Sequence, residues 1–135
     1  MKMERIKKED LKAFWPLAAK ILEKAFKPNQ IYTLADIHSA LEKEEAQLWC
    51  IFNENEVIGS LVTSIDAASK GRICNILKLA GIKFKAWAKL METTLNDFAK
   101  MHECINIEAL TRSGFSRVLP SFKKQRDVLL IRKVI

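Results

Sequence analysis

Few titratable side chains in this chain could do acid–base chemistry, and they are scattered. Glu108 is a lone carboxylate within a mostly apolar run, residues 104–110, that is typical of a strand. A carboxylate near the centre of a sheet can act as a general base, so Glu108 is the candidate catalytic residue. The alternative is a salt-bridged or exposed glutamate. His38 and His102 lie on or beside predicted helices, and the sequence shows no Ser/His/Asp or Cys/His set.

Two lysines stand between an apolar run, residues 72–80, and an amphipathic stretch that begins near residue 86. Lys83 and Lys85 could bind an anionic group through their side chains. The alternative is that both are solvated surface residues. Gly81 precedes them and can simply end the strand.

The three cysteines, Cys50, Cys74 and Cys104, have no close spacing, and all lie inside apolar runs. A metal site needs convergent ligands, usually with a short C-x-x-C pair, so the sequence predicts no metal site. We expect reduced cysteines that pack as small hydrophobic residues, which fits a cytoplasmic protein.

The chain has 135 residues and a net charge of +7. This length suits one domain with a core of its own, so we expect a single domain over residues 1–135. The positive charge is compatible with an anionic partner, such as nucleic acid, a phosphorylated ligand or an acidic protein, and equally with a solvated surface. No apolar run approaches the length of a membrane span, so no membrane association is expected.

Helical spacing of apolar residues predicts three helices. Asp10 could cap the first, and Pro16 either kinks it or marks its start. Thr33 and Asp36 form a predicted capping box for the second. The third has the strongest stripe. The apolar positions of the first are Leu11, Phe14, Trp15, Ala18, Leu22 and Ala25, and those of the third are Trp87, Leu90, Met91, Leu95, Phe98 and Met101.

Five apolar segments read as strands: residues 47–52, 57–65, 72–80, 104–110 and 128–135. The first two should form a hairpin, in which Gly59 indicates a bulge or a close backbone approach. Residues 72–80 are apolar on both faces and should be central. A short helical or irregular piece is expected over residues 113–122. The order is α-α-β-β-β-α-β-α-β, an α/β fold with a mixed sheet whose third and fourth strands are parallel across the long helix.

This order resembles the GNAT (N-acetyltransferase-like) fold over nearly the whole chain. Residues 53–60, Asn-Glu-Asn-Glu-Val-Ile-Gly-Ser, resemble the family's second hairpin, and residues 72–80 with the following helix resemble its cofactor-binding strand and helix. The resemblance implies that acetyl-CoA is the cofactor if the chain is an enzyme; otherwise no cofactor is expected. The implied cofactor-binding residues are Leu79, Ala80, Ile82, Lys83, Phe84, Lys85 and Ala86.

Two positions depart from the family pattern. The family's Q/R-x-x-G-x-G/A loop, whose glycines let backbone N–H groups reach the pyrophosphate, falls on residues 82–87. There Lys85 and Trp87 replace the glycines, and the indole of Trp87 is expected to obstruct the phosphate. The family's Tyr, a general acid, corresponds to Arg117, which stays charged. The only tyrosine, Tyr32, lies in an early predicted loop.

The segment from Ile107 to Pro120 is similar to an "IE…R-x-G-W-x-R-x-L" phrase of small GNAT-like bacteriophage proteins, with Phe115 at the Trp position. This resemblance implies a phage or prophage origin, hence a viral protein in the host cytoplasm or the virion. Three hypotheses follow. The first is a GNAT-fold protein with a degenerate acyl-CoA site that acts through a protein partner, as a virion or assembly component. The second is an active N-acetyltransferase with an atypical loop, and the third is a basic nucleic-acid-binding domain.

Overall fold

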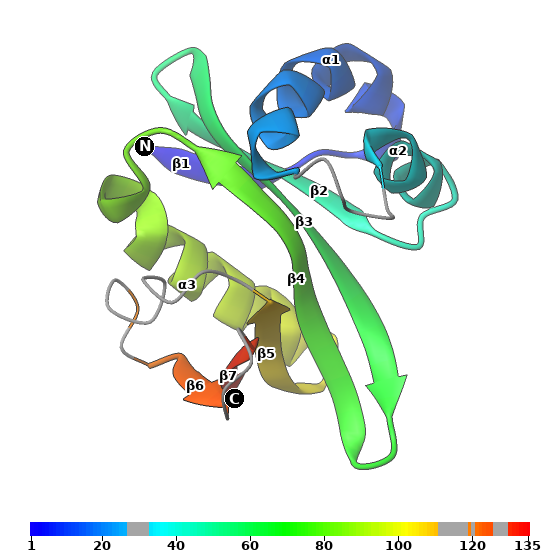
Figure 1. Ribbon diagram of the computed structural model, residues 1–135, viewed down its shortest axis with the longest axis vertical. Helices are drawn as coiled ribbons and strands as arrows, with labels where there is room; N and C mark the ends of the chain where they lie inside the picture. The colour runs from blue at the N-terminus through cyan, green and yellow to red at the C-terminus, as the bar shows by residue number, and fades with distance from the viewer. Residues whose placement is uncertain (27–32, 111–118, 120, 126–129) are drawn as a thin grey trace. The chain divides into compact units, whose positions relative to one another are not determined.

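A computed structural model describes residues 1–26, 33–110, 119, 121–125 and 130–135 of the chain. In this part of the chain seven strands form one sheet in the order β1-β2-β3-β4-β5-β7-β6. Contacts divide the chain into two compact units, residues 1–63 with 78–84 and residues 64–77 with 85–135. The strands β3 (Glu56–Ala68) and β4 (Gly71–Gly81) contribute to both units and form a long hairpin (Figure 1). β4 has the central place in the strand order, as predicted.

The first unit contains two helices that pack beside β2 (Gln47–Asn53). α1 (Leu11–Leu22) follows a 3-10 turn (Lys8–Asp10), and α2 is Leu34–Glu42. The short strand β1 (Lys2–Arg5) pairs antiparallel with β2. Sequence analysis did not predict β1. Apolar side chains of the two helices and of β2 and β3 form one core: Leu11, Ala18, Leu22, Ile37, Leu41, Ala46, Leu48, Cys50 and Val62.

Three local predictions can be compared with this unit. The capping box is present, because the Thr33 N–H donates to Asp36 Oδ2 over 2.8 Å and the Asp36 N–H donates to the Thr33 hydroxyl. The cap at Asp10 was wrong: this residue already has helical dihedrals as the end of the 3-10 turn, so its side chain accepts no capping hydrogen bond. Pro16 lies inside α1, so it does not mark the start of the helix.

The β2–β3 hairpin contains the irregularity expected beside Gly59. Ile51 lies opposite Gly59 while Phe52 lies opposite Val57, so Ile58 is the extra residue of a bulge. The carbonyl of Ile58 accepts a hydrogen bond of 2.9 Å from the N–H of Ile82, which follows β4. The bulge therefore contacts the loop that leads into the next helix.

The second unit contains α3 (Phe84–Met101), β5 (Cys104–Leu110), β6 (Lys123–Gln125) and β7 (Leu130–Val134). β5 runs parallel to β4 and antiparallel to β7, so the sheet is mixed, as the sequence predicted. Most of the predicted stripe of α3 is confirmed, since Trp87, Met91, Leu95 and Phe98 are buried. The place of Met101 in the stripe was wrong, because this last residue of the helix is 77% exposed. Most of the predicted piece over residues 113–122 lies outside the described residues.

Candidate functional site

The connection from β4 to α3 is only two residues long. Gly81 ends the strand with a φ of +150°, and Lys83 has a φ of +57° immediately before the first residue of α3, Phe84. A positive φ is uncommon for a residue with a side chain and occurs mostly in tight turns, as also at Glu44, Glu54 and Glu103. The chain therefore turns sharply from the central strand into the helix.

The first turn of α3 contains no acidic residue, and the lysine, phenylalanine and alanine side chains at its start carry no hydrogen-bond acceptor. By contrast, α2 begins with an Asp36 carboxylate and a Thr33 hydroxyl that accept backbone N–H groups. A helix start with a partial positive charge and lysines beside it attracts anions, because the dipole and the side chains act in the same direction.

The Trp87 indole is 0% exposed and belongs to the buried stripe of α3, as its place in that stripe predicts. Its expected obstruction of a phosphate stays a prediction. Ala86, one residue earlier, is small and exposed. Of the other residues predicted to bind the cofactor, Leu79, Ala80 and Phe84 are half-buried, whereas Ile82, Lys83 and Lys85 are exposed.

The pairing of β4 with β5 covers only part of β4. The parallel register runs from Arg72 opposite Cys104 to Ile76 opposite Ala109. β4 continues for five residues beyond Ile76, to Gly81, while β5 ends one residue beyond Ala109. The parallel neighbours are confirmed, and the divergence of the two strands beyond this pairing stays a prediction.

Glu108, the candidate catalytic residue, lies on β5 opposite Asn75 of β4 and is 7% exposed. The exposed alternative is therefore wrong. The Asn75 amide donates to Asp66 Oδ2 on β3, and this oxygen also accepts the Ser64 hydroxyl over 2.8 Å. Residues opposite each other in a ladder share a face, so Glu108 lies on the same face as Asn75. A buried carboxylate here can take a proton from a reacting amine.

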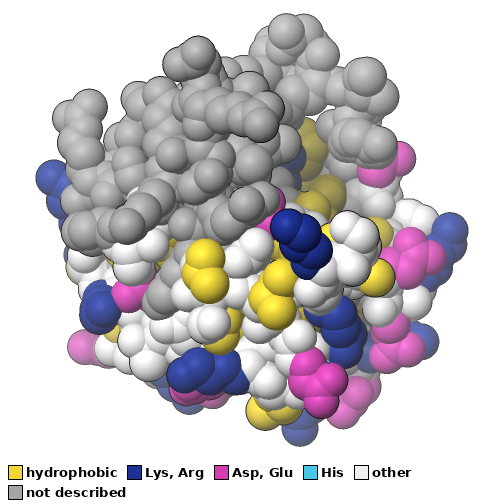
Figure 2. All heavy atoms as spheres, turned by 90° about the horizontal axis from the view of Figure 1, so that it is seen from below, with side chains coloured by type: hydrophobic (Ala, Val, Ile, Leu, Met, Phe, Trp, Pro, Cys, Tyr) yellow, Lys and Arg dark blue, Asp and Glu magenta, His cyan; other side chains and the backbone are white. Residues whose placement is uncertain are grey.

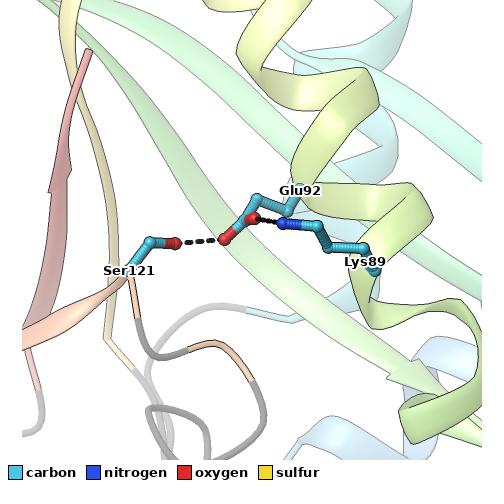
Figure 3. A network of polar contacts seen from close by, with 3 residues as sticks. All are labelled: Lys89, Glu92 and Ser121. Carbon is cyan, nitrogen blue, oxygen red and sulfur yellow. Dashed lines mark hydrogen bonds and ion pairs between the residues drawn. The ribbon is translucent and has the colours of Figure 1, made fainter.

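A second buried carboxylate, Glu92 of α3, was missed by sequence analysis (Figure 3). It is 4% exposed and lies in the middle of the helix. Lys89 Nζ is 2.7 Å from its Oε1 atom, and the Ser121 hydroxyl donates to Oε2. The spacing of Lys89 and Glu92 on one helix is visible in the sequence. Nothing in the sequence indicates that Ser121, 29 residues later, reaches the same carboxylate.

The two histidines have local partners. The His38 imidazole stacks on Trp15 with ring centroids 4.9 Å apart, and its Nδ1 atom is 3.2 Å from Glu42 Oε1. The His102 ring lies 4.5 Å from that of Phe98. Tyr32 and Arg117, the residues considered for the general acid, lie outside the described residues.

All three cysteines are buried thiols, as predicted. Burial raises the pKa of Cys50 to about 11 and, with the nearby Cys104 and Asp66, that of Cys74 to about 12. Across residues that the structure describes, no cluster of His, Cys, Asp or Glu could hold a metal ion. No helix in that part of the chain is long and apolar enough to cross a membrane.

Known proteins resemble this chain in structure, whereas comparisons of its sequence find no match. No family model matches the chain, and no curated protein matches it. A probable acetyltransferase of known structure matches with a TM-score of 0.71 and 15% identity, over 94% of this chain and 93% of that one. A predicted acetyltransferase from Clostridium acetobutylicum, solved with acetyl-CoA, matches with a TM-score of 0.69 and 14% identity, over 93% and 92%.

A GNAT family acetyltransferase from Brucella melitensis, in complex with acetyl-CoA, also matches with a TM-score of 0.69 and 14% identity. This match covers 98% of the present chain and 86% of the Brucella protein. At such low identity the likeness is one of fold. Together with the mixed sheet, the parallel β4–β5 pair and the connecting helix, it shows that this chain has the GNAT acetyltransferase fold.

Proposed function

We propose that this chain binds acetyl-CoA at the start of α3 and transfers the acetyl group to an amine. The observation that carries the proposal is the start of α3, where the exposed Lys83 and Lys85 directly follow the central parallel strand and no acidic residue lies in the first turn. It is supported by the complexes of two proteins of the same fold with acetyl-CoA.

The residues at the start of α3 fit an anionic cofactor. Lys83 and Lys85 are exposed and would pair with phosphate oxygens. Acetyl-CoA would supply an acetyl group activated as a thioester. Because exposed lysines hold an anion without fixed geometry, we expect weaker and more salt-sensitive binding than a glycine loop gives.

Glu108 is the proposed proton acceptor for the amine. An ammonium group must lose a proton before its nitrogen can attack a thioester, and a buried carboxylate can accept that proton. Asn75, opposite Glu108 on β4, donates its amide hydrogen to Asp66. We propose no residue for the proton that the leaving thiolate needs.

Calorimetric titration of acetyl-CoA tests the cofactor site. The double variant Lys83→Gln, Lys85→Gln should bind acetyl-CoA roughly tenfold more weakly, because it loses two exposed charge pairs. The matched control replaces Lys70 and Lys100, which are also exposed, and should leave the affinity unchanged. Equal losses in the two double variants would show unspecific attraction to a basic protein. Absence of binding by the wild-type chain at millimolar acetyl-CoA would overturn the proposal.

The proposed base is tested separately, with acetyl transfer to a panel of simple amines as the readout. Glu108→Gln should lower turnover by about a hundredfold or more and leave acetyl-CoA affinity unchanged, because the carboxylate acts on the amine. The loss should shrink as pH rises, since a growing fraction of the amine is then already deprotonated. Full activity of this variant would remove Glu108 from the mechanism.

A second candidate is a GNAT-fold protein that has lost acyl-CoA chemistry and acts through a protein partner. It is favoured by the absence of glycine from residues 82–87 and by Arg117 at the family's Tyr position. The phage origin, with a cytoplasmic or virion location, belongs to this candidate and rests on the segment 107–120. Nucleic-acid binding needs basic residues gathered on one face. Figure 2 shows both signs of charge interspersed among the described side chains of the face it draws.

A further inference from the structure

A groove of about 460 Å³ lies on the first unit, between α1 and α2. Trp15 and Pro16 line it from α1, and His38 and Glu42 line it from α2. The volume is within the range of small-molecule sites. The proposed cofactor site uses none of these residues.

One wall of the groove is a preformed aromatic surface. The Trp15 and His38 rings are stacked with centroids 4.9 Å apart and planes 10° from parallel. Glu42 holds the imidazole at its Nδ1 atom over 3.2 Å, so the His38 ring is fixed at its face and at its edge. Both rings are half-buried. Such a surface favours the stacking of a further flat ring at low entropic cost.

The charges around the groove leave one cation available. Lys8, at the rim, pairs with Glu44 over 3.7 Å, and the Glu42 carboxylate lies 3.2 Å from His38 Nδ1. Lys12 also lines the groove and is exposed, and it has no ion pair with any residue that the structure describes. Because Lys8 is already paired with Glu44, Lys12 is the lysine of the groove that can receive an anion from a ligand.

We propose that this groove binds a small aromatic carboxylate, a flat ring that carries one carboxylate group. The ring stacks against the Trp15 and His38 surface, and the carboxylate pairs with Lys12. Lys8, Leu11, Lys12 and Trp15 follow one face of the chain entering α1, so the cation and the ring belong to the same helical stripe. An acidic protein segment is the competing occupant, and a flat preformed wall with a single available cation suits the smaller ligand.

Nuclear magnetic resonance of the tryptophan indole N–H groups tests the site with indole-3-acetate as probe. Trp15 is half-buried, whereas Trp49 and Trp87 are buried, so the three signals separate groove binding from general effects. The Trp15 signal, assigned with Trp15→Phe, should shift and saturate with a Kd on the order of 1 mM. Tryptophol, which has the same ring and an alcohol in place of the carboxylate, should bind more weakly. Equal binding of the two probes would overturn the role of the carboxylate.

The matched variants are Lys12→Gln and Lys20→Gln, both exposed positions of α1. Lys12→Gln should weaken indole-3-acetate binding by about two- to fivefold, the range for one exposed ion pair, and leave tryptophol binding unchanged. Lys20→Gln should change neither. Failure of the Trp15 signal to shift at about ten times the expected Kd, or equal losses in the two variants, would overturn the site. Acetyl-CoA titration does not depend on this groove, so either proposal can fail without the other.

Discussion

At the scale of single residues, the carboxylate of Glu92 is the side chain whose environment most needs explanation. Burying a charge is costly unless hydrogen bonds and an opposite charge compensate it. Here the Ser121 hydroxyl donates to one oxygen and Lys89 pairs with the other. The Lys89 side chain is exposed, so solvent screens its contribution. Of these two contacts, the hydrogen bond from the short Ser121 side chain should contribute more than the screened ion pair with Lys89.

This assignment predicts an order of effects on the free energy of unfolding. Ser121→Ala should cost about 1.5–3 kcal/mol, because it removes a hydrogen bond to a buried charge. Lys89→Ala should cost no more than about 0.5–1 kcal/mol. Urea unfolding of the two variants gives the comparison. A larger cost for Lys89→Ala would mean that the ion pair, and not the hydroxyl, keeps Glu92 stable in the interior.

The buried thiols predict how stability changes with pH. The pKa of Cys50 is raised by burial from its ordinary value of 9.0 to about 11, and that of Cys74 to about 12. Between pH 9 and 11 the unfolded chain therefore loses thiol protons that the folded chain keeps. Stability must fall as pH rises through this window, by up to about 1.4 kcal/mol per pH unit for each thiol.

Urea midpoints measured between pH 8 and about pH 10.5 test this decline. Cys74→Ala should be less stable than the wild type at pH 8, and its stability should fall less steeply above pH 9. Lysines titrate near the same range in both proteins, so the difference between the two slopes isolates the thiol. Parallel slopes would show that Cys74 ionises equally in the folded and unfolded chains.

At the scale of elements, α3 carries the clearest agreement between sequence and structure. Phe98 is 7% exposed, as its place in the apolar stripe predicts, whereas Met101 at the end of the helix is 77% exposed. Phe98→Ala should destabilise the fold by about 3–5 kcal/mol through lost burial and a cavity. Met101→Ala should stay within about 0.5 kcal/mol. Similar costs for both substitutions, measured by urea unfolding, would contradict this helix register.

The elements that sequence analysis missed are those with little periodic signal. β1 has four residues with one buried side chain, Met3, and forms because β2 offers it a partner edge. β6 has three polar residues and forms by pairing with β7. A periodic pattern of apolar residues indicates which face of an element is buried. Short strands that are held mainly by backbone hydrogen bonds to a neighbouring strand have no such pattern. The cap at Asp10 failed for a related reason, because a preceding 3-10 turn had already fixed its dihedrals.

Only part of the candidate site could be predicted from the sequence. Lys83, Lys85 and Glu108 were identified because the apolar patterns of β4, α3 and β5 locate the strand–helix junction and the β5 strand. The apolar stripe also placed Trp87 on the buried face of α3, where the structure has it. The Glu92–Ser121 hydrogen bond joins distant parts of the chain, and no local pattern encodes it.

At the scale of the whole molecule, the two compact units share strands. Residues 56–63 of β3 belong to the first unit and residues 64–68 to the second, and β4 is divided between residues 77 and 78. Because β3 and β4 each run through both units, unfolding of a strand in one unit should disrupt the pairing of the same strand in the other. We therefore propose that residues 1–135 behave as a single folding domain, as their length suggests.

Two tryptophans placed in different units allow a test of this proposal. Trp49, whose indole donates to Thr63 over 2.9 Å, reports on the first unit, and the buried Trp87 reports on the second. Variants that keep only Trp49 or only Trp87 should each show a urea transition by fluorescence that coincides with the transition by far-ultraviolet circular dichroism of the same variant. Comparison within one variant removes the effect of the substitutions on stability. If the Trp87 fluorescence changes at lower urea than the circular dichroism, the second unit unfolds independently, and the chain comprises two domains that share two strands.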